Sequence, residues 1–176
     1  DQHLNVMISR LKTEFKVEVN LETPKVPYRE TITSVGSAQY RHKKQTGGHG
    51  QFAEVHLRLE PLQDAEFEFA NEVVGGNIPK NYIPAVEKGV VETLQDGPLA
   101  GCKVINIKAV VYDGKHHAVD SSEMAFKIAA RMAFRAAMKD AKANLLEPIM
   151  TLKIMFPEEY MGDISGDLNS RRGRIL

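Results

Sequence analysis

The stretch YDGKHHAVDSSE, residues 112–123, joins a β-branched run to a long segment with helical periodicity. The run, residues 104–111, favours a strand because β-branched side chains pack well on a pleated surface. Asp113-Gly114 follows the run and predicts a tight turn, because glycine adopts positive φ at no steric cost. We therefore expect the chain to leave the strand at this dipeptide.

The second half of the same stretch predicts the start of a helix. Asp120 and Glu123 stand at capping-box spacing ahead of the apolar-periodic segment. Between the turn and the cap lie Lys115, His116 and His117, on a loop that regular structure holds at both ends. Such a loop presents its side chains to a partner in a fixed pose.

Hydrophobic patterning predicts the remaining elements. Strands are expected at residues 17–21, 28–35, 39–45, 52–59, 66–69 and 151–156, and helices at residues 4–15, 84–97, 120–144 and 157–173. Residues 28–35 and 39–45 are expected to pair as a hairpin, and a phase slip between Phe52 and Val55 favours a bulge. Strands and helices mix without strict alternation, which favours an α+β fold: a sheet with helices mainly on one face.

Composition narrows the class of protein. Hydrophobic residues make up 43% and charged residues 26%, as in ordinary globular proteins. The formal net charge of +0 means that any nucleic-acid footprint must be local. A single cysteine, Cys102, excludes an internal disulfide and favours the cytosol. No apolar run reaches the roughly 18 residues that span a membrane, and the absence of an initial Met suggests a fragment of a longer protein.

Catalytic, metal and nucleotide chemistry find little support in the sequence. Gly114-Lys115 has Ala109 where a P-loop has its first glycine, and the glycine-rich residues 47–50 lie between two expected strands. No two His or Cys residues have helical metal-ligand spacing, and Ser121-Ser122 stand where capping is the simpler role. We expect no catalytic residue, no metal and no cofactor in this chain.

Local basic clusters are more informative. Arg41, Lys43 and Lys44 lead directly into the glycine-rich loop with His49. Such charge either protects an edge strand from aggregation or contacts RNA. If this loop and the one at 113–117 share an end of the sheet, they form a basic tip suited to phosphates and 2′-hydroxyls. Arg171 and Arg172 end the last expected helix, where they either complement its dipole or contact RNA.

Ordered motifs along nearly the whole chain resemble the C-terminal half of the elongation factor G family. They are YRETI (28–32), TGGHGQF (46–52), GGNIPK (75–80), YIPAVEKG (82–89), GPLAG (97–101), YDG (112–114), VDSSEMAFK (119–127), LEPIM (146–150), PEEYMGD (157–163), GDLN (166–169) and RRG (171–173). The resemblance implies that residues 1–24 end ferredoxin-like domain III. It also implies that residues 25–146 form domain IV, similar to domain 2 of ribosomal protein S5, and that residues 147–176 open ferredoxin-like domain V.

The resemblance also implies a function. The family drives translocation of transfer RNA and messenger RNA, with the tip of domain IV in the decoding region of the small ribosomal subunit. The implied partners are therefore ribosomal RNA, transfer RNA and messenger RNA, for a cytoplasmic monomer whose GTPase domain, with GTP and Mg²⁺, lies N-terminal to this chain. The expected RNA-contact residues are Gly48, His49, Gly50, Gln51, Asp113, Gly114, Lys115, His116 and His117.

Some residues depart from the commonest family pattern. His117 falls at the tip histidine of the family, but Lys115 and His116 replace the usual Ser-Tyr and His49 replaces Arg. These departures leave open a paralogue specialised in ribosome recycling. From the residues alone, a stand-alone RNA-binding module and a metal-dependent hydrolase are the rival hypotheses.

Overall fold

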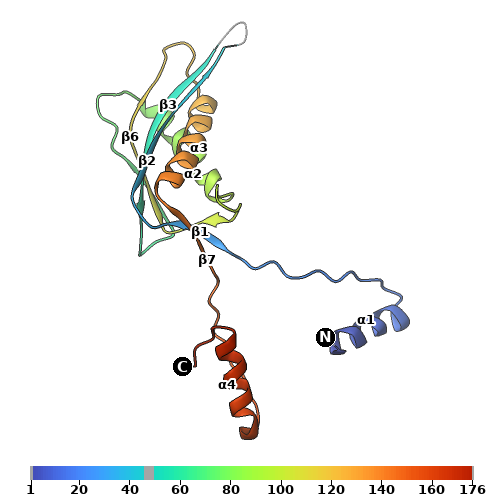
Figure 1. Cartoon of the computed structure of the whole chain (residues 1–176). Helices are drawn as coiled ribbons and strands as arrows, with labels where there is room; N and C mark the ends of the chain where they lie inside the picture. Colours follow the sequence, from blue (N-terminus) through green and yellow to red (C-terminus); the bar gives the residue numbers. More distant parts are fainter. Residues whose placement is uncertain (1, 46–49, 176) are drawn as a thin grey trace.

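The computed structural model describes residues 2–45 and 50–175 (Figure 1). The elements in chain order are α1 (Gln2–Glu14), β1 (Arg29–Ile32), β2 (Gly36–Lys44), β3 (Gln51–Pro61), β4 (Phe67–Asn71), η1 (Lys80–Tyr82), α2 (Ile83–Leu94), β5 (Lys103–Val104), β6 (Ile107–Lys115), α3 (Glu123–Asp140), β7 (Ala143–Leu146), η2 (Glu158–Tyr160) and α4 (Met161–Ser170). Strands and helices are mixed, so the expected α+β class is confirmed.

The main sheet has the strand order β2-β3-β6-β4. β2, β3 and β6 run antiparallel, while β4 runs parallel to β6. Both α2 and α3 lie on the same side of this sheet, α3 against β2 and β3, and α2 against α3 (Figure 1). The expectation of helices on one face is therefore confirmed for the main sheet.

The core lies between this sheet and α3. Alternate residues of β3, namely Ala53, Val55, Leu57 and Leu59, are fully buried, whereas the residues between them face solvent. The facing stripe of α3 is built mainly from alanines, with Phe126, Phe134 and Met138 as the large residues. Small side chains let the helix approach the sheet closely, and the two aromatic rings are the largest of the fully buried side chains.

A second, smaller sheet has the order β5-β1-β7. Arg29 pairs with Leu146 in the antiparallel ladder between β1 and β7. The part of the chain between them, residues 29–146, which we call the central body, therefore begins and ends on adjacent strands. Glu30 is fully buried in β1, and its carboxylate accepts hydrogen bonds from the backbone N–H groups of Leu99, Ala100 and Cys102 at 2.8–3.1 Å. These three bonds explain how a carboxylate is accommodated in the interior.

Two expectations about strand pairing are wrong. β1 does not form a hairpin with β2, because β1 belongs to the smaller sheet and β2 pairs with β3. The irregularity in β3 falls between His56 and Leu57, not between Phe52 and Val55, because Ala53 takes the inward position before Val55. Both partners of β1 lie far away in the chain, and local pattern carries no information about such pairing.

Several expected boundaries are also wrong. Residues 17–21 and 151–156 do not form strands, since no neighbouring strand pairs with them among the described residues. The helix expected to reach about Asn144 ends at Asp140, and Asn144 lies in β7. The run at residues 104–111 is split between β5 and β6, because Asn106 adopts a positive φ of 61° between them.

Candidate nucleic-acid interface

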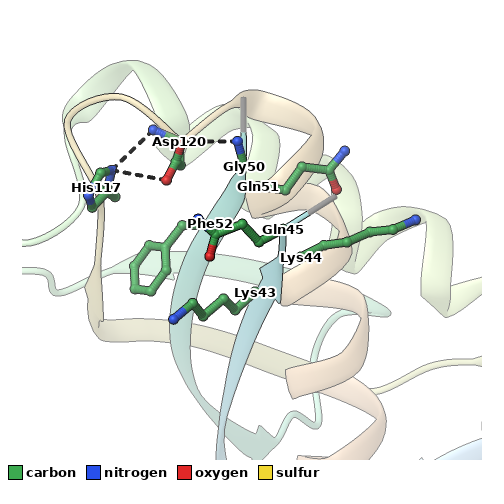
Figure 2. A pocket seen from close by; sticks show the side chains of 8 residues that line it. All are labelled: Lys43, Lys44, Gln45, Gly50, Gln51, Phe52, His117 and Asp120. Carbon is green, nitrogen blue, oxygen red and sulfur yellow. Dashed lines mark hydrogen bonds and ion pairs between the residues drawn. The ribbon is translucent and has the colours of Figure 1, made fainter. Parts of the chain in front are cut away.

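Two segments far apart in the sequence meet at one end of the main sheet (Figure 2). The carboxylate Oδ1 of Asp120 accepts a hydrogen bond from the backbone N–H of Gly50 at 3.1 Å. The backbone carbonyl of Asp120 accepts another from Phe52 at 2.8 Å. We call residues 43–45, 50–52 and 115–121 the tip. The meeting of the two loops, on which the sequence hypothesis depended, is therefore observed for the described residues.

Two serines fix the loop to its surroundings. The Ser121 hydroxyl accepts from the backbone N–H of His117 at 2.9 Å and donates to the carbonyl of Phe52 at 2.8 Å. Ser122 is the N-cap of α3, and its hydroxyl accepts from Ala125 at 3.2 Å. The expectation that Asp120 caps this helix is wrong, because its carboxylate binds Gly50 instead.

The expected tight turn at Asp113-Gly114 is wrong as well. Both residues lie inside β6, where Gly114 pairs with Val55. A Cβ on Gly114 would come within 2.4 Å of the Glu54 carbonyl oxygen and 2.5 Å of the Ile78 side chain. Glycine is needed here because two neighbours approach closely, and the strand continues to Lys115 before the loop begins.

The tip encloses an open hollow of about 270 Å³. Lys43 and Lys44 border it from the end of β2: Lys43 extends to the same side as the rings of Phe52 and His117, and Lys44 extends to the opposite side (Figure 2). Phe52 and His117 lie with ring centroids 6.1 Å apart and tilted by 57°. Among the described residues, no ion pair neutralises Lys43 or Lys44, so their ammonium groups remain available to an anion.

Arg41 has a different environment from the two lysines. Its guanidinium forms an ion pair with Glu54, which also accepts a hydrogen bond from His56 at 3.0 Å. Burial alone would raise the pKa of Glu54, but the hydrogen bonds from His56 and Arg41 outweigh it and hold that pKa below its ordinary value. Arg41 therefore belongs to a charged network on the solvent face of the sheet, whereas Lys43 and Lys44 belong to the tip.

Asp113 and His116 both contact a third segment, the loop before η1. Asn77 donates its side-chain amide to the Asp113 carboxylate at 2.8 Å, and the Gly114 N–H donates to the same oxygen at 2.8 Å. The hydrogen bond from Asn77 is the main cause that lowers the pKa of Asp113. His116 Nδ1 lies 3.1 Å from the Asn77 carbonyl oxygen. Sequence reasoning assigned no role to Asn77, although its place after Gly75-Gly76 marks a turn.

Comparison with known proteins decides the family. Residues 24–142 match the model described as elongation factor G, domain IV, and residues 144–176 match the elongation factor G C-terminus. The chain belongs to the elongation factor G family. The resemblance inferred from the sequence motifs is thereby confirmed.

Relatives agree with this family assignment. The chain is 54% identical over 176 residues to elongation factor G of Petrotoga mobilis, covering 98% of this chain and 25% of that protein. It also matches a crystal structure from Thermus thermophilus at 49% identity and a TM-score of 0.85, covering 100% of this chain and 26% of the other. The chain thus spans about a quarter of the length of these relatives.

Part of the expected RNA-contact set lies beyond what the structure describes. Gly48 and His49 lie outside the described residues. Arg171 and Arg172, after α4, form ion pairs with Asp167 and Glu147 at 3.0 and 2.9 Å. In the described ranges, no group of three His, Cys, Asp or Glu side chains is placed to hold a metal ion. No helix in those ranges combines the length and apolar character needed to cross a bilayer.

Proposed function

We propose that this chain is the part of a ribosomal translocase that reaches the decoding region of the small subunit. Its tip would promote the movement of transfer RNA and messenger RNA. The observation that carries the proposal is the joining of Gly50–Phe52 to His117–Ser121 at one end of a well-packed sheet. Membership of the elongation factor G family supports it.

The chemistry of the tip suits RNA. Lys43 and Lys44 offer ammonium groups for phosphate oxygens, Gln51 offers an amide, and His117 offers a ring that is 54% exposed. Phosphates fix the position of a bound RNA, and 2′-hydroxyls and base edges are accessible in its shallow minor groove. A tip rich in donors can therefore hold a short helix of codon and anticodon by its shape.

The proposal also assigns the chain to domains of the longer protein and assigns GTP binding to another part of that protein. Residues 1–24 would end domain III, residues 25–146 form domain IV, and residues 147–176 open domain V. The junction between the two matching family models, at residues 142–144, supports the second boundary. GTP and Mg²⁺ would bind to another part of the protein, a monomer of the cytoplasm, and this chain would hold no cofactor and perform no catalysis.

The test is a His117→Ala substitution in the full-length factor that contains this chain. We expect single-round translocation to slow roughly tenfold or more, since a hydrogen bond to a charged group is worth about 1.5–3 kcal/mol. Ribosome-dependent GTP turnover should stay normal because the proposed function assigns GTP binding to another part of the protein. The matched control is an Asp64→Asn variant, in the exposed bend at the opposite end of β3.

Wild-type translocation by the His117→Ala factor would refute the assigned role. The substitution of Lys115-His116 for the usual pair keeps a recycling paralogue as the second candidate. A wild-type factor that splits ribosomes into subunits but does not translocate would establish that alternative.

A further inference from the structure

The contacts of His117 determine which of its ring nitrogens carries the proton. Nδ1 lies 3.3 Å from the backbone nitrogen of Val119 and 3.2 Å from that of Asp120, with both N–H groups directed at it. A backbone N–H can only donate, so Nδ1 must accept. The neutral ring therefore carries its hydrogen on Nε2, at the opposite edge of the imidazole.

Protonation of the ring does not change what Nε2 presents. Asp120 Oδ2 lies 3.5 Å from Nδ1 and would become the counter-ion of a charged ring. Nε2 carries a hydrogen in the imidazolium as well as in this neutral tautomer. His117 is thus a hydrogen-bond donor through Nε2 in both charge states, and it offers no acceptor there.

The side chain of Asp120 holds the amide that binds His117 Nδ1. Its Oδ1 accepts from Gly50, so the loop is anchored to the residue that immediately precedes β3 (Figure 2). The fit is tight, because a Cβ on Gly50 would lie 3.0 Å from the carboxylate carbon of Asp120. The bonds from Phe52 to the Asp120 carbonyl and from Ser121 to the Phe52 carbonyl also hold this loop, so we expect the loss of the Asp120 side chain to loosen the Val119 and Asp120 amides beside the ring rather than to release the loop.

We propose that Asp120 is a positioning residue that keeps the proton of His117 on Nε2, so that the tip binds hydrogen-bond acceptors of RNA. Suitable acceptors are phosphate oxygens, 2′-hydroxyl oxygens and the minor-groove acceptors of the bases. The identity of the ligand rests on the proposed function, whereas the position of the proton rests on the contacts of the loop alone.

Nuclear magnetic resonance of the 176-residue chain, labelled with ¹⁵N-histidine, tests the proton position directly. At about pH 8.5, well above the ordinary pKa of imidazole, His117 should show an unprotonated Nδ1 and a protonated Nε2. The spectrum of a His117→Gln variant identifies the resonances by their loss. A protonated Nδ1 in the neutral ring would overturn the proposal.

Two variants test the positioning role of Asp120. In Asp120→Ala the two ring ¹⁵N resonances should move toward each other, as the tautomers mix. In Asp120→Asn they should stay apart, because the amide oxygen can still accept from Gly50. Unchanged resonances in Asp120→Ala would refute the positioning role, and Asp64→Asn controls for loss of an aspartate charge.

The same variants in the full-length factor separate this proposal from the proposed function. We expect Asp120→Ala to slow translocation several-fold and Asp120→Asn to restore most of the rate. Equal losses in both variants would show that charge matters instead of position. If His117→Ala translocates normally while the resonances behave as expected, the proposed function fails and the proton assignment stands.

Discussion

Replacement of Gly114 tests whether this residue serves a strand or a turn. In the structure Gly114 lies in β6 opposite Val55, and a Cβ there would meet the Glu54 carbonyl at 2.4 Å and Ile78 at 2.5 Å. Overpacking of this kind costs about 1–3 kcal/mol. Replacing glycine by alanine also raises the free energy of unfolding by about 0.4–1 kcal/mol, because the unfolded chain then has fewer accessible conformations. We therefore expect Gly114→Ala to lower the free energy of unfolding by about 1–2 kcal/mol.

The assay is urea unfolding of the 176-residue chain, followed by circular dichroism. At this chain length each kcal/mol corresponds to about 2–4 °C in melting temperature, which gives a second measure. The control is Gly166→Ala in α4, where no neighbouring atom lies within 4 Å of the added Cβ. The control should not lower stability, since alanine favours helix over glycine.

A third variant, Gly114→Asn, separates the two hypotheses. Asparagine tolerates positive φ better than alanine. If Gly114 served a turn, the asparagine variant would therefore be more stable than the alanine variant. In a crowded strand the larger side chain is worse, so the expected order of stability is Gly, then Ala, then Asn. An asparagine variant as stable as the alanine variant, or more stable, would refute the assignment of Gly114 to steric crowding.

Two further predictions concern buried and partly buried carboxylates. Glu30→Ala leaves three backbone N–H groups of the 97–102 loop without their acceptor. It should cost at least about 3 kcal/mol in urea unfolding; a loss below about 1 kcal/mol would contradict the role of Glu30. Asn77→Ala removes the main cause of the lowered pKa of Asp113. A carboxyl group whose pKa is lower in the folded chain than in the unfolded chain stabilises the fold at pH values above its unfolded pKa. This stabilisation is lost as the pH falls through its folded pKa. The variant should therefore lose about 1 kcal/mol at neutral pH and less near pH 3, and a loss independent of pH would contradict this.

Elements with a self-contained local signal were predictable from the sequence. The alternation in β3, the small-residue stripe of α3 and the Pro84 start of α2 each depend on residues within one element. Residues 17–21 show why the same signal is insufficient. Their alternation fits a strand, but a strand needs a partner, and none pairs with them among the described residues.

The sequence indicated which residues lie at the site, but not the contacts that hold them in place. The basic and histidine-bearing loops were found because glycine and charge mark exposed segments. The functions of Asp120 and Gly114 were missed because each depends on contacts some 60–70 residues away in the chain, with Gly50 for Asp120 and with β3 for Gly114. A local rule assigned Asp120 to a helix cap and Gly114 to a turn, since those are the commonest roles of such residues next to regular structure.

The antiparallel pairing of β1 with β7 places the two ends of the central body side by side. Because Arg29 and Leu146 are ladder partners, their backbones are separated by only the spacing of adjacent strands, about 5 Å. If the body were removed, a linker of two or three residues would therefore be long enough to span the distance between its two ends. Such a deletion would give a factor that differs from the wild type only in what lies between these two residues.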